Sequence, residues 1–168
     1  IKRPADWHKI SVEKLIDIAI PNIKDGALIV DYGCGTGGST IELLKTLDMR
    51  GLEVELILID PLVSWFSKAR KILGERDNVH FELSVKTDSS GKKSFRRLEE
   101  MLSERKADLI ISSSTLHLIP ANKIGDLMIQ FANSLCEDGI LIWDSGDIES
   151  DLRPENSALL HDPFRQVR

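Results

Sequence analysis

Apolar and polar residues alternate along the 168-residue chain in blocks that predict strands and helices in succession. Short apolar runs bounded by turn residues are typical of buried strands, whereas apolar residues recurring every three or four positions are typical of helices packed on a sheet. The predicted strands lie at 28–31, 54–59, 79–83, 108–111 and 140–143, and helical spacing lies at 11–19, 39–50, 64–73, 95–102 and 122–135. This alternation predicts right-handed crossovers and a parallel sheet between two helical layers.

Turn and cap residues place the expected ends of the first and last helices. Ser11 is expected to cap the first helix and Asn122 the last, because both residue types accept hydrogen bonds from free backbone amides. The sequence Glu137-Asp138-Gly139 is expected to close the last helix.

The stretch 28–40 combines a strand, a glycine-rich loop and the first turn of a helix. The apolar run ends in Asp31, and four glycines follow at positions 33, 35, 37 and 38. Glycine at this density costs conformational entropy, so it fits best where the backbone adopts a positive φ or approaches a ligand closely. We therefore expect a ligand in this loop, with a structural turn that binds nothing as the alternative.

The charge of the loop indicates the kind of ligand. The spacing Gly33-x-Gly35-x-x-Gly38 matches a dinucleotide fingerprint, in which a pyrophosphate lies on the N-terminus of the following helix. Asp31 at the end of the strand would repel a pyrophosphate and attract an ammonium group. The loop therefore favours a zwitterionic or cationic ligand.

The same residues resemble motif I of the class I S-adenosylmethionine-dependent methyltransferases. That motif is an acidic residue, any residue and then Gly-x-Gly-x-Gly, which Asp31, Gly33, Gly35 and Gly37 match position for position. The resemblance covers roughly residues 10–147. It implies S-adenosylmethionine as the cofactor, with these four residues in its site. It also implies an α/β fold, a Rossmann-like three-layer α/β/α sandwich with a mainly parallel sheet in the strand order 3-2-1-4-5. Relatives usually close the sheet with two further strands, which we expect this chain to lack.

An acidic residue, Asp60, ends the second predicted strand 22 positions after Gly38, close to the spacing of a ribose-binding carboxylate. One carboxylate can accept hydrogen bonds from both hydroxyls of a ribose. By resemblance, Asp60 binds the ribose and Leu62 lies against the adenine. The alternative is that Asp60 is a solvated acid at the end of a strand.

Many relatives bind the adenine amino group through an acid just after the third strand. Here that place is taken by Ser84-Val85, and Asp88 is the remaining candidate.

Small hydroxyl residues follow the fourth strand, and small side chains let a ligand approach the backbone closely. By resemblance, Ser112 and Ser113 contact the methionine part of the cofactor. His117 is expected to act as a general base or substrate hydrogen-bond donor, with a purely structural role as the alternative and His8 as the second choice for a base. Asp144 ends the fifth strand, where several relatives line the substrate cavity, and a turn-forming acid is its other interpretation.

Composition narrows the expected partners. The formal net charge of −5 offers no general attraction to nucleic acid, and the basic run 92–97 is expected to be a solvated helix face. The chain also lacks the Asn/Asp-Pro-Pro-aromatic signature of many amino-methylating relatives, which disfavours a nucleobase acceptor. No apolar segment has the length of a membrane helix, no secretory signal is visible, and the two cysteines have no zinc-like spacing. We therefore expect a soluble cytoplasmic protein with a small-molecule substrate and no metal.

One domain is expected for residues 1–168, with a helical segment at 1–25, a cofactor-binding core at 26–147 and a tail or lid at 148–168. Trp7 and His8 are expected either to close over the cofactor or to form an exposed leader. The sequence carries no signal for an oligomeric state.

The expected reaction is methyl transfer from S-adenosylmethionine to a small molecule by direct in-line displacement, which needs two reactants held in register and no covalent enzyme intermediate. Two other classes stay open. An NAD(P)-dependent oxidoreductase is supported by the dinucleotide spacing and Asp60, and the other class is a catalytically silent cofactor-binding module.

Overall fold

The computed structural model describes residues 4–144, with side chains described from residue 9 onward. The elements follow the chain as α1 (Pro4–Ala19), η1 (Ile20–Asn22), β1 (Leu28–Tyr32), α2 (Gly38–Arg50), β2 (Glu55–Asp60), α3 (Val63–Leu73), β3 (Val79–Leu83), β4 (Val85–Thr87), β5 (Lys93–Phe95), α4 (Leu98–Met101), β6 (Ala107–Ser112), η2 (Leu116–Leu118), α5 (Ala121–Ser134) and β7 (Leu135–Trp143). The predicted tail at 148–168 lies outside the described residues.

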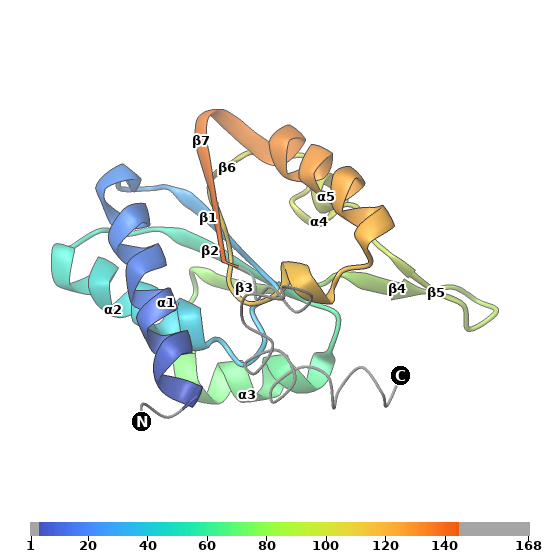
Figure 1. Ribbon diagram of the computed structural model, residues 1–168, viewed down its shortest axis with the longest axis horizontal. Helices are drawn as coiled ribbons and strands as arrows, with labels where there is room; N and C mark the ends of the chain where they lie inside the picture. The colour runs from blue at the N-terminus through green and yellow to red at the C-terminus, as the bar shows by residue number, and fades with distance from the viewer. Residues whose placement is uncertain (1–3, 145–168) are drawn as a thin grey trace, which may run out of the picture.

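Five strands form one sheet in the order β3-β2-β1-β6-β7, and every neighbouring pair is parallel (Figure 1). Counted along the chain without the β4–β5 pair, this is the predicted order 3-2-1-4-5. The predicted Rossmann-like α/β fold is therefore confirmed. The central strand β1 is buried along its whole length, as expected for a parallel strand covered on both faces.

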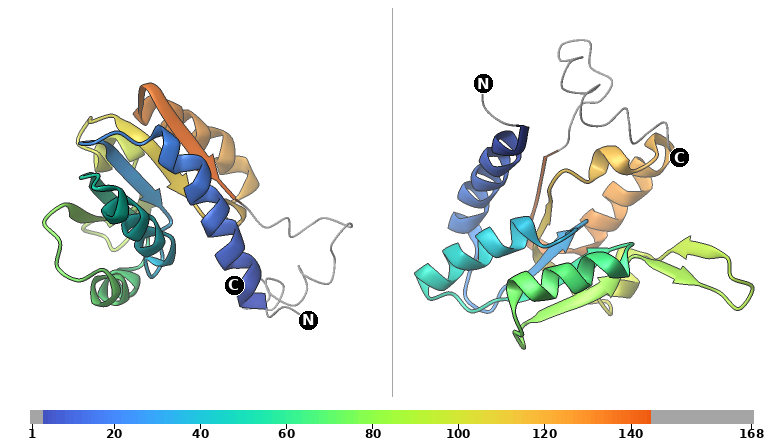
Figure 2. Two further views of the ribbon diagram at one scale, coloured as in Figure 1. Left: turned by 90° about the vertical axis from the view of Figure 1, so that its left-hand side faces the viewer. Right: turned by 90° about the horizontal axis from the view of Figure 1, so that it is seen from below.

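Helices cover both faces of the sheet (Figure 2). One face packs against α1, α2 and α3, and the other packs against α4 and α5. Because side chains alternate along a strand, Ile29 of β1 contributes to the first core and Val30 to the second. Phe131 of α5 is fully buried, and its ring meets Tyr32 edge-on at 5.1 Å between centroids. Packing on both faces fixes the positions of β1 and β2, whose carboxyl ends lie next to each other.

The β4–β5 hairpin was not expected from the sequence. The predicted helix at 95–102 is wrong at its start, because Lys93–Phe95 pairs antiparallel with Val85–Thr87 and only Leu98–Met101 is helical. The turn between the strands is stabilised by Asp88, whose carboxylate accepts hydrogen bonds from the backbone amides of Ser90 and Lys92. This local turn favours strand pairing over helical continuation.

The expected caps also differ from the structure. Ser11 lies inside α1, which begins seven residues earlier at Pro4, and Asn122 lies one residue inside α5, which has no side-chain cap. The last helix ends at Ser134 rather than at Gly139, and the following residues belong to β7. A register irregularity between β6 and β7 accommodates these extra strand residues. No helix within residues 4–144 is long and apolar enough to cross a membrane.

Candidate functional site

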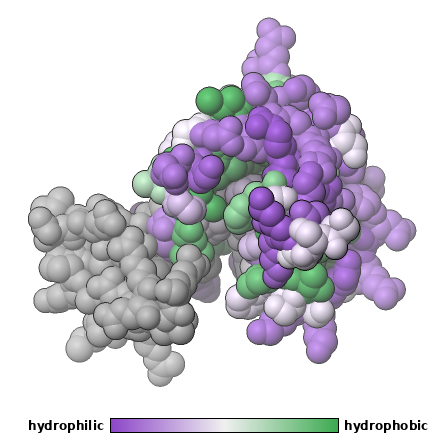
Figure 3. Space-filling model, turned by 90° about the vertical axis from the view of Figure 1, so that its right-hand side faces the viewer, coloured by the Kyte–Doolittle hydropathy of each residue, from purple (hydrophilic) through white to green (hydrophobic). Residues whose placement is uncertain are grey.

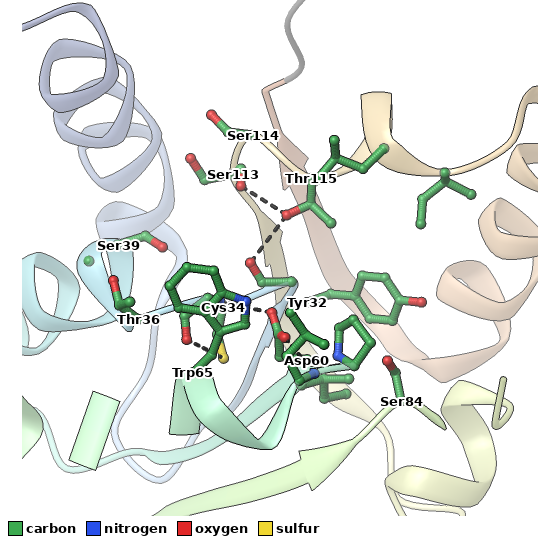
Figure 4. Close-up of a pocket in the computed structure, with 18 of the residues that line it drawn as sticks. Tyr32, Cys34, Thr36, Ser39, Asp60, Trp65, Ser84, Ser113, Ser114 and Thr115 are labelled. Atoms are coloured by element: carbon green, nitrogen blue, oxygen red, sulfur yellow. Dashed lines mark hydrogen bonds between the residues drawn. The ribbon is translucent and has the colours of Figure 1, made fainter. Parts of the chain in front are cut away.

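A cavity of about 660 Å³ lies at the carboxyl ends of the parallel strands (Figure 4). Its lining comes from the connections after β1, β2 and β6, together with Ser84 after β3 and Phe95 on β5. Ligands in open α/β sheets bind at this edge, because the loops that follow the strands converge there. The predicted site residues Gly33, Gly35, Asp60, Leu62 and Ser113 all line the cavity.

The three glycines of the motif have different structural roles, although each has a positive φ. A Cβ on Gly33 would lie 2.2 Å from Oγ1 of Thr115, so this position allows two loops to touch. A Cβ on Gly35 would meet nothing within 4 Å, and this residue faces the cavity. Gly37 precedes α2 with φ 81° and packs near Ala69 of α3, outside the cavity lining.

Asp60 is a buried carboxylate at the cavity, with 6% of its surface exposed. The backbone amide of Leu62 donates to Oδ1 at 2.9 Å, and that of Gly35 donates to Oδ2 at 3.1 Å. Burial raises the pKa of Asp60, and these two amides oppose the shift. Each carboxylate oxygen has a further lone pair, so Asp60 can accept hydrogen bonds from a ligand while it holds the glycine loop in place.

Asp31 is fully buried and is not among the residues that line the cavity. Strand alternation turns its carboxylate toward the N-terminus of α2, where Oδ2 accepts hydrogen bonds from Thr40 at 2.5 Å and Ser39 at 3.2 Å. Burial raises the pKa of Asp31 to about 6, although the two hydroxyl groups oppose the shift. Ser39 itself lines the cavity, so Asp31 lies one side chain behind the site. A direct role of Asp31 in cofactor binding stays a prediction.

The hydroxyl run after β6 divides into structural and cavity-facing residues. Ser112 is fully buried outside the cavity lining and donates to the carbonyl oxygen of Tyr32 at 2.9 Å. The Thr115 hydroxyl lies 3.0 Å from the carbonyl oxygen of Ser113. Ser113 and Ser114 line the cavity, and their buried hydroxyl oxygens have no hydrogen-bond partner among the described residues. Buried hydroxyl groups are normally paired, so these two are available to a ligand.

The other predicted residues lie around the site rather than in its lining. His117 belongs to η2, but it is not among the lining residues, whereas its neighbour Leu118 is. Asp88 lies in the hairpin turn, outside the cavity lining.

Asp144 accepts hydrogen bonds from the Ser11 hydroxyl and from the amide of Ser114 at 2.5 Å, so it connects α1 and the end of β7 to the loop after β6. The side chains of Trp7 and His8 lie outside the described part of the chain.

Trp65, Phe95 and Ser84 line the cavity, although the sequence did not place them in the site. Trp65 and Phe95 lie in the segments 64–73 and 95–102, whose apolar spacing predicts helices, and Phe95 belongs instead to strand β5. Ser84 follows β3 directly, at a place where the sequence has no acidic residue. In residues 9–144 no group of acidic, histidine and cysteine side chains could hold a metal ion. Cys34 is a free, buried thiol whose pKa is raised, chiefly by burial.

Comparison with known proteins identifies the family of this architecture. The sequence profile of a methyltransferase domain matches residues 30–141. Among solved structures, the C-methyltransferase (CMeT) domain of the citrinin polyketide synthase is similar at 20% identity and a TM-score of 0.57, over 82% of this chain and 34% of that one. The N-methyltransferase NodS from Bradyrhizobium japonicum WM9, solved with S-adenosyl-L-homocysteine, is similar at 14% identity and a TM-score of 0.59, over 80% and 60%.

The carbon methyltransferase CurJ is similar at 22% identity and a TM-score of 0.57, over 79% of this chain and 33% of that one. The chain therefore spans between a third and three fifths of the length of these three structures. No curated protein sequence matches this chain significantly.

Proposed function

This chain belongs to the methyltransferase domain family, and from that premise we propose that it transfers the methyl group of S-adenosylmethionine to a small-molecule acceptor. The proposal is supported by the position of the cavity, which lies where the glycine loop, the end of β2 and the hydroxyl run after β6 meet.

The observation that carries the proposal is Asp60 beside Gly35. The carboxylate is held at the cavity by two backbone amides, while Gly35 leaves open space next to it. A ribose fits this arrangement, because its two hydroxyl groups can donate to one carboxylate and because no Cβ fills the approach. Leu62 lines the same cavity, with half of its surface exposed, and offers an apolar contact for the adenine.

The opposite part of the cavity fits an amino-acid group better than a diphosphate. Ser113 and Ser114 provide two buried hydroxyl groups that lack partners in the described residues, and such groups can bind a carboxylate or an ammonium group. The N-terminus of α2, where a pyrophosphate would bind, already faces the buried carboxylate of Asp31. A diphosphate would therefore meet a negative charge at its binding place, whereas an ammonium group would be attracted to it.

The residues of this site would act mainly by holding two reactants in register and by excluding water. When bound, S-adenosylmethionine supplies an electrophilic methyl group on a sulfonium ion. The acceptor would then attack in line with the sulfur–methyl bond. We assign no proton transfer to His117 in this proposal, because it is not among the cavity-lining residues.

Titration calorimetry with S-adenosylhomocysteine and with NAD tests the cofactor. We expect binding of S-adenosylhomocysteine and no measurable binding of NAD. Tight NAD binding without a response to S-adenosylhomocysteine would contradict the proposal and support a nucleotide-dependent oxidoreductase. Transfer of a labelled methyl group to a panel of small metabolites tests the reaction, and cofactor binding without transfer to any of them would support a silent binding module.

A further inference from the structure

We infer that the acceptor has an apolar body that lies against Phe95 and an anionic group that lies near Lys93. The inference rests on the proposed function, because it concerns the part of the same cavity that the cofactor would leave to its acceptor. It is carried by the β4–β5 hairpin, which projects from the end of the sheet (Figure 1) and whose residue Phe95 lines the cavity.

Phe95 is 67% exposed although it lines the cavity. Leu118 of η2, which also lines the cavity, is 50% exposed. Figure 3 views the molecule from the side toward which the hairpin projects, and hydrophobic patches lie there among hydrophilic side chains around a hollow. Large apolar side chains gathered at an opening favour an apolar ligand, because binding removes their surface from water. Neither residue comes from the glycine loop or from the end of β2, so they are suited to the acceptor.

Lys93 shares the face of the hairpin that carries Phe95. The two residues are two positions apart on β5, and strand alternation places such residues on one face, about 7 Å apart along the strand. Lys93 is exposed and has no ion pair among the described residues. An anionic group on a ligand in contact with Phe95 could therefore reach the Lys93 ammonium group.

Two neighbouring cations of the hairpin region are already paired with carboxylates. Lys86 lies 3.4 Å from Glu100, and Arg96 lies 2.7 Å from Glu82. Among the described residues that line the cavity, Asp60 is the one charged side chain. An anionic group would thus be repelled from the inner cavity by Asp60 and attracted at its rim by Lys93, which orients the acceptor with its neutral end inward.

Lys92 provides a matched control. It directly precedes β5, so alternation turns its side chain away from that of Lys93, and it also has no ion pair among the described residues. A charge reversal at either lysine changes the net charge equally. Only the change at Lys93 alters the face that carries Phe95.

The test uses two fluorescent probes, the anionic 8-anilinonaphthalene-1-sulfonate and the neutral N-phenyl-1-naphthylamine, which lacks the sulfonate. Both are titrated against the full chain saturated with S-adenosylhomocysteine. We expect Lys93→Glu to weaken binding of the anionic probe about fivefold, the upper range of an exposed ion pair, and to leave the neutral probe within about twofold. Lys92→Glu should leave both probes unchanged, and Phe95→Ser should weaken both about tenfold.

Equal effects of the two lysine changes on the anionic probe would overturn the inference, because a general field rather than a site would then attract the anion. Loss of S-adenosylhomocysteine affinity in Phe95→Ser would also overturn it, because the hairpin would then belong to the cofactor site. If the parent chain self-associates and Phe95→Ser abolishes this self-association, the exposed apolar side chains of Phe95 and Leu118 bind a second copy of the chain rather than the acceptor. Failure of the parent chain to bind S-adenosylhomocysteine counts instead against the proposed function, and calorimetry without either probe detects it.

Discussion

Asp60 is the residue on which the cofactor assignment depends. Asp60→Ala is expected to weaken binding of S-adenosylhomocysteine by about 1.5–3 kcal/mol, because charged hydrogen bonds to the ribose would be lost. The measurement is calorimetry at pH 7. Asp88→Ala is the matched control, since it removes the same charge from an exposed turn outside the cavity lining, and it should leave the affinity unchanged. Equal affinities for Asp60→Ala and the parent chain would remove Asp60 from the site, and a loss in Asp88→Ala would place Asp88 at the adenine.

Asp31 makes stability depend on pH. Its pKa is about 6 in the folded chain and near 3.8 in the unfolded chain, so the unfolded state releases its proton first as the pH rises. The contribution of Asp31 to stability is therefore fully present below pH 3.8 and is lost as the pH rises through 6. We expect the unfolding free energy of the parent chain, relative to Asp31→Asn, to fall by about 2–3 kcal/mol between pH 4 and pH 7. Urea unfolding at each pH measures this difference, and two parallel stability curves would contradict it.

The sequence predicts His117 as a general base from its position after the fourth strand, and this role can be tested by substitution. Because it is not among the cavity-lining residues, His117→Gln is expected to lower kcat by less than about tenfold, whereas removal of a general base typically costs about 10²–10⁴. Turnover is measured against pH with an acceptor that the metabolite panel identifies. A loss of a hundredfold or more, together with loss of one limb of the pH profile, would establish the predicted role as a base.

At the scale of elements, two glycines of the loop between β1 and α2 have different roles. We expect Gly33 to matter chiefly for stability and Gly35 chiefly for ligand binding. Gly33→Ala would place a Cβ 2.2 Å from Thr115 at a positive φ, so we expect it to destabilise the fold by about 2 kcal/mol or more. Gly35→Ala meets no atom within 4 Å and should cost about 1–2 kcal/mol for its φ alone, but its methyl group would occupy the approach to Asp60. Urea unfolding and calorimetry should therefore show a loss chiefly of stability in the first variant and chiefly of affinity in the second. Similar stabilities in the two variants would contradict this division.

The hairpin shows where element prediction from the sequence failed. Phe95, Leu98 and Met101 have helical spacing, yet Phe95 points toward the cavity from a strand. The competing signal was the turn at Asp88, whose side chain binds two backbone amides and sets the register of the pairing. Three-residue strands of mixed polarity carry too little periodicity to outweigh a helical pattern.

At the scale of the whole molecule, the sheet is shared by two cores on its opposite faces. Leu47 is fully buried in the core with α1, α2 and α3, and Phe131 is fully buried in the core with α4 and α5. Truncation of either to alanine should lower the unfolding free energy by about 2–5 kcal/mol. Because both cores share β1, each variant should unfold in one transition, with coincident curves by circular dichroism and fluorescence. Ile129→Ala on the exposed face of α5 is the control, and separate transitions for the two cores would contradict shared cooperativity.

The sequence by itself determined the strand and helix alternation and the motif Asp31 to Gly37, because periodicity, turn residues and glycine spacing are local properties of the chain. The strand order followed from the family resemblance that this motif carries. The sequence also indicated that Asp60 lies at the carboxyl ends of the strands, where Asp60 lines the cavity. Only the tertiary structure decided that Asp31 faces α2, that Ser112 and His117 lie outside the cavity lining, and that Phe95 lies within it. Which way a side chain points depends on the elements that pack around its backbone, and that packing joins segments far apart in the sequence.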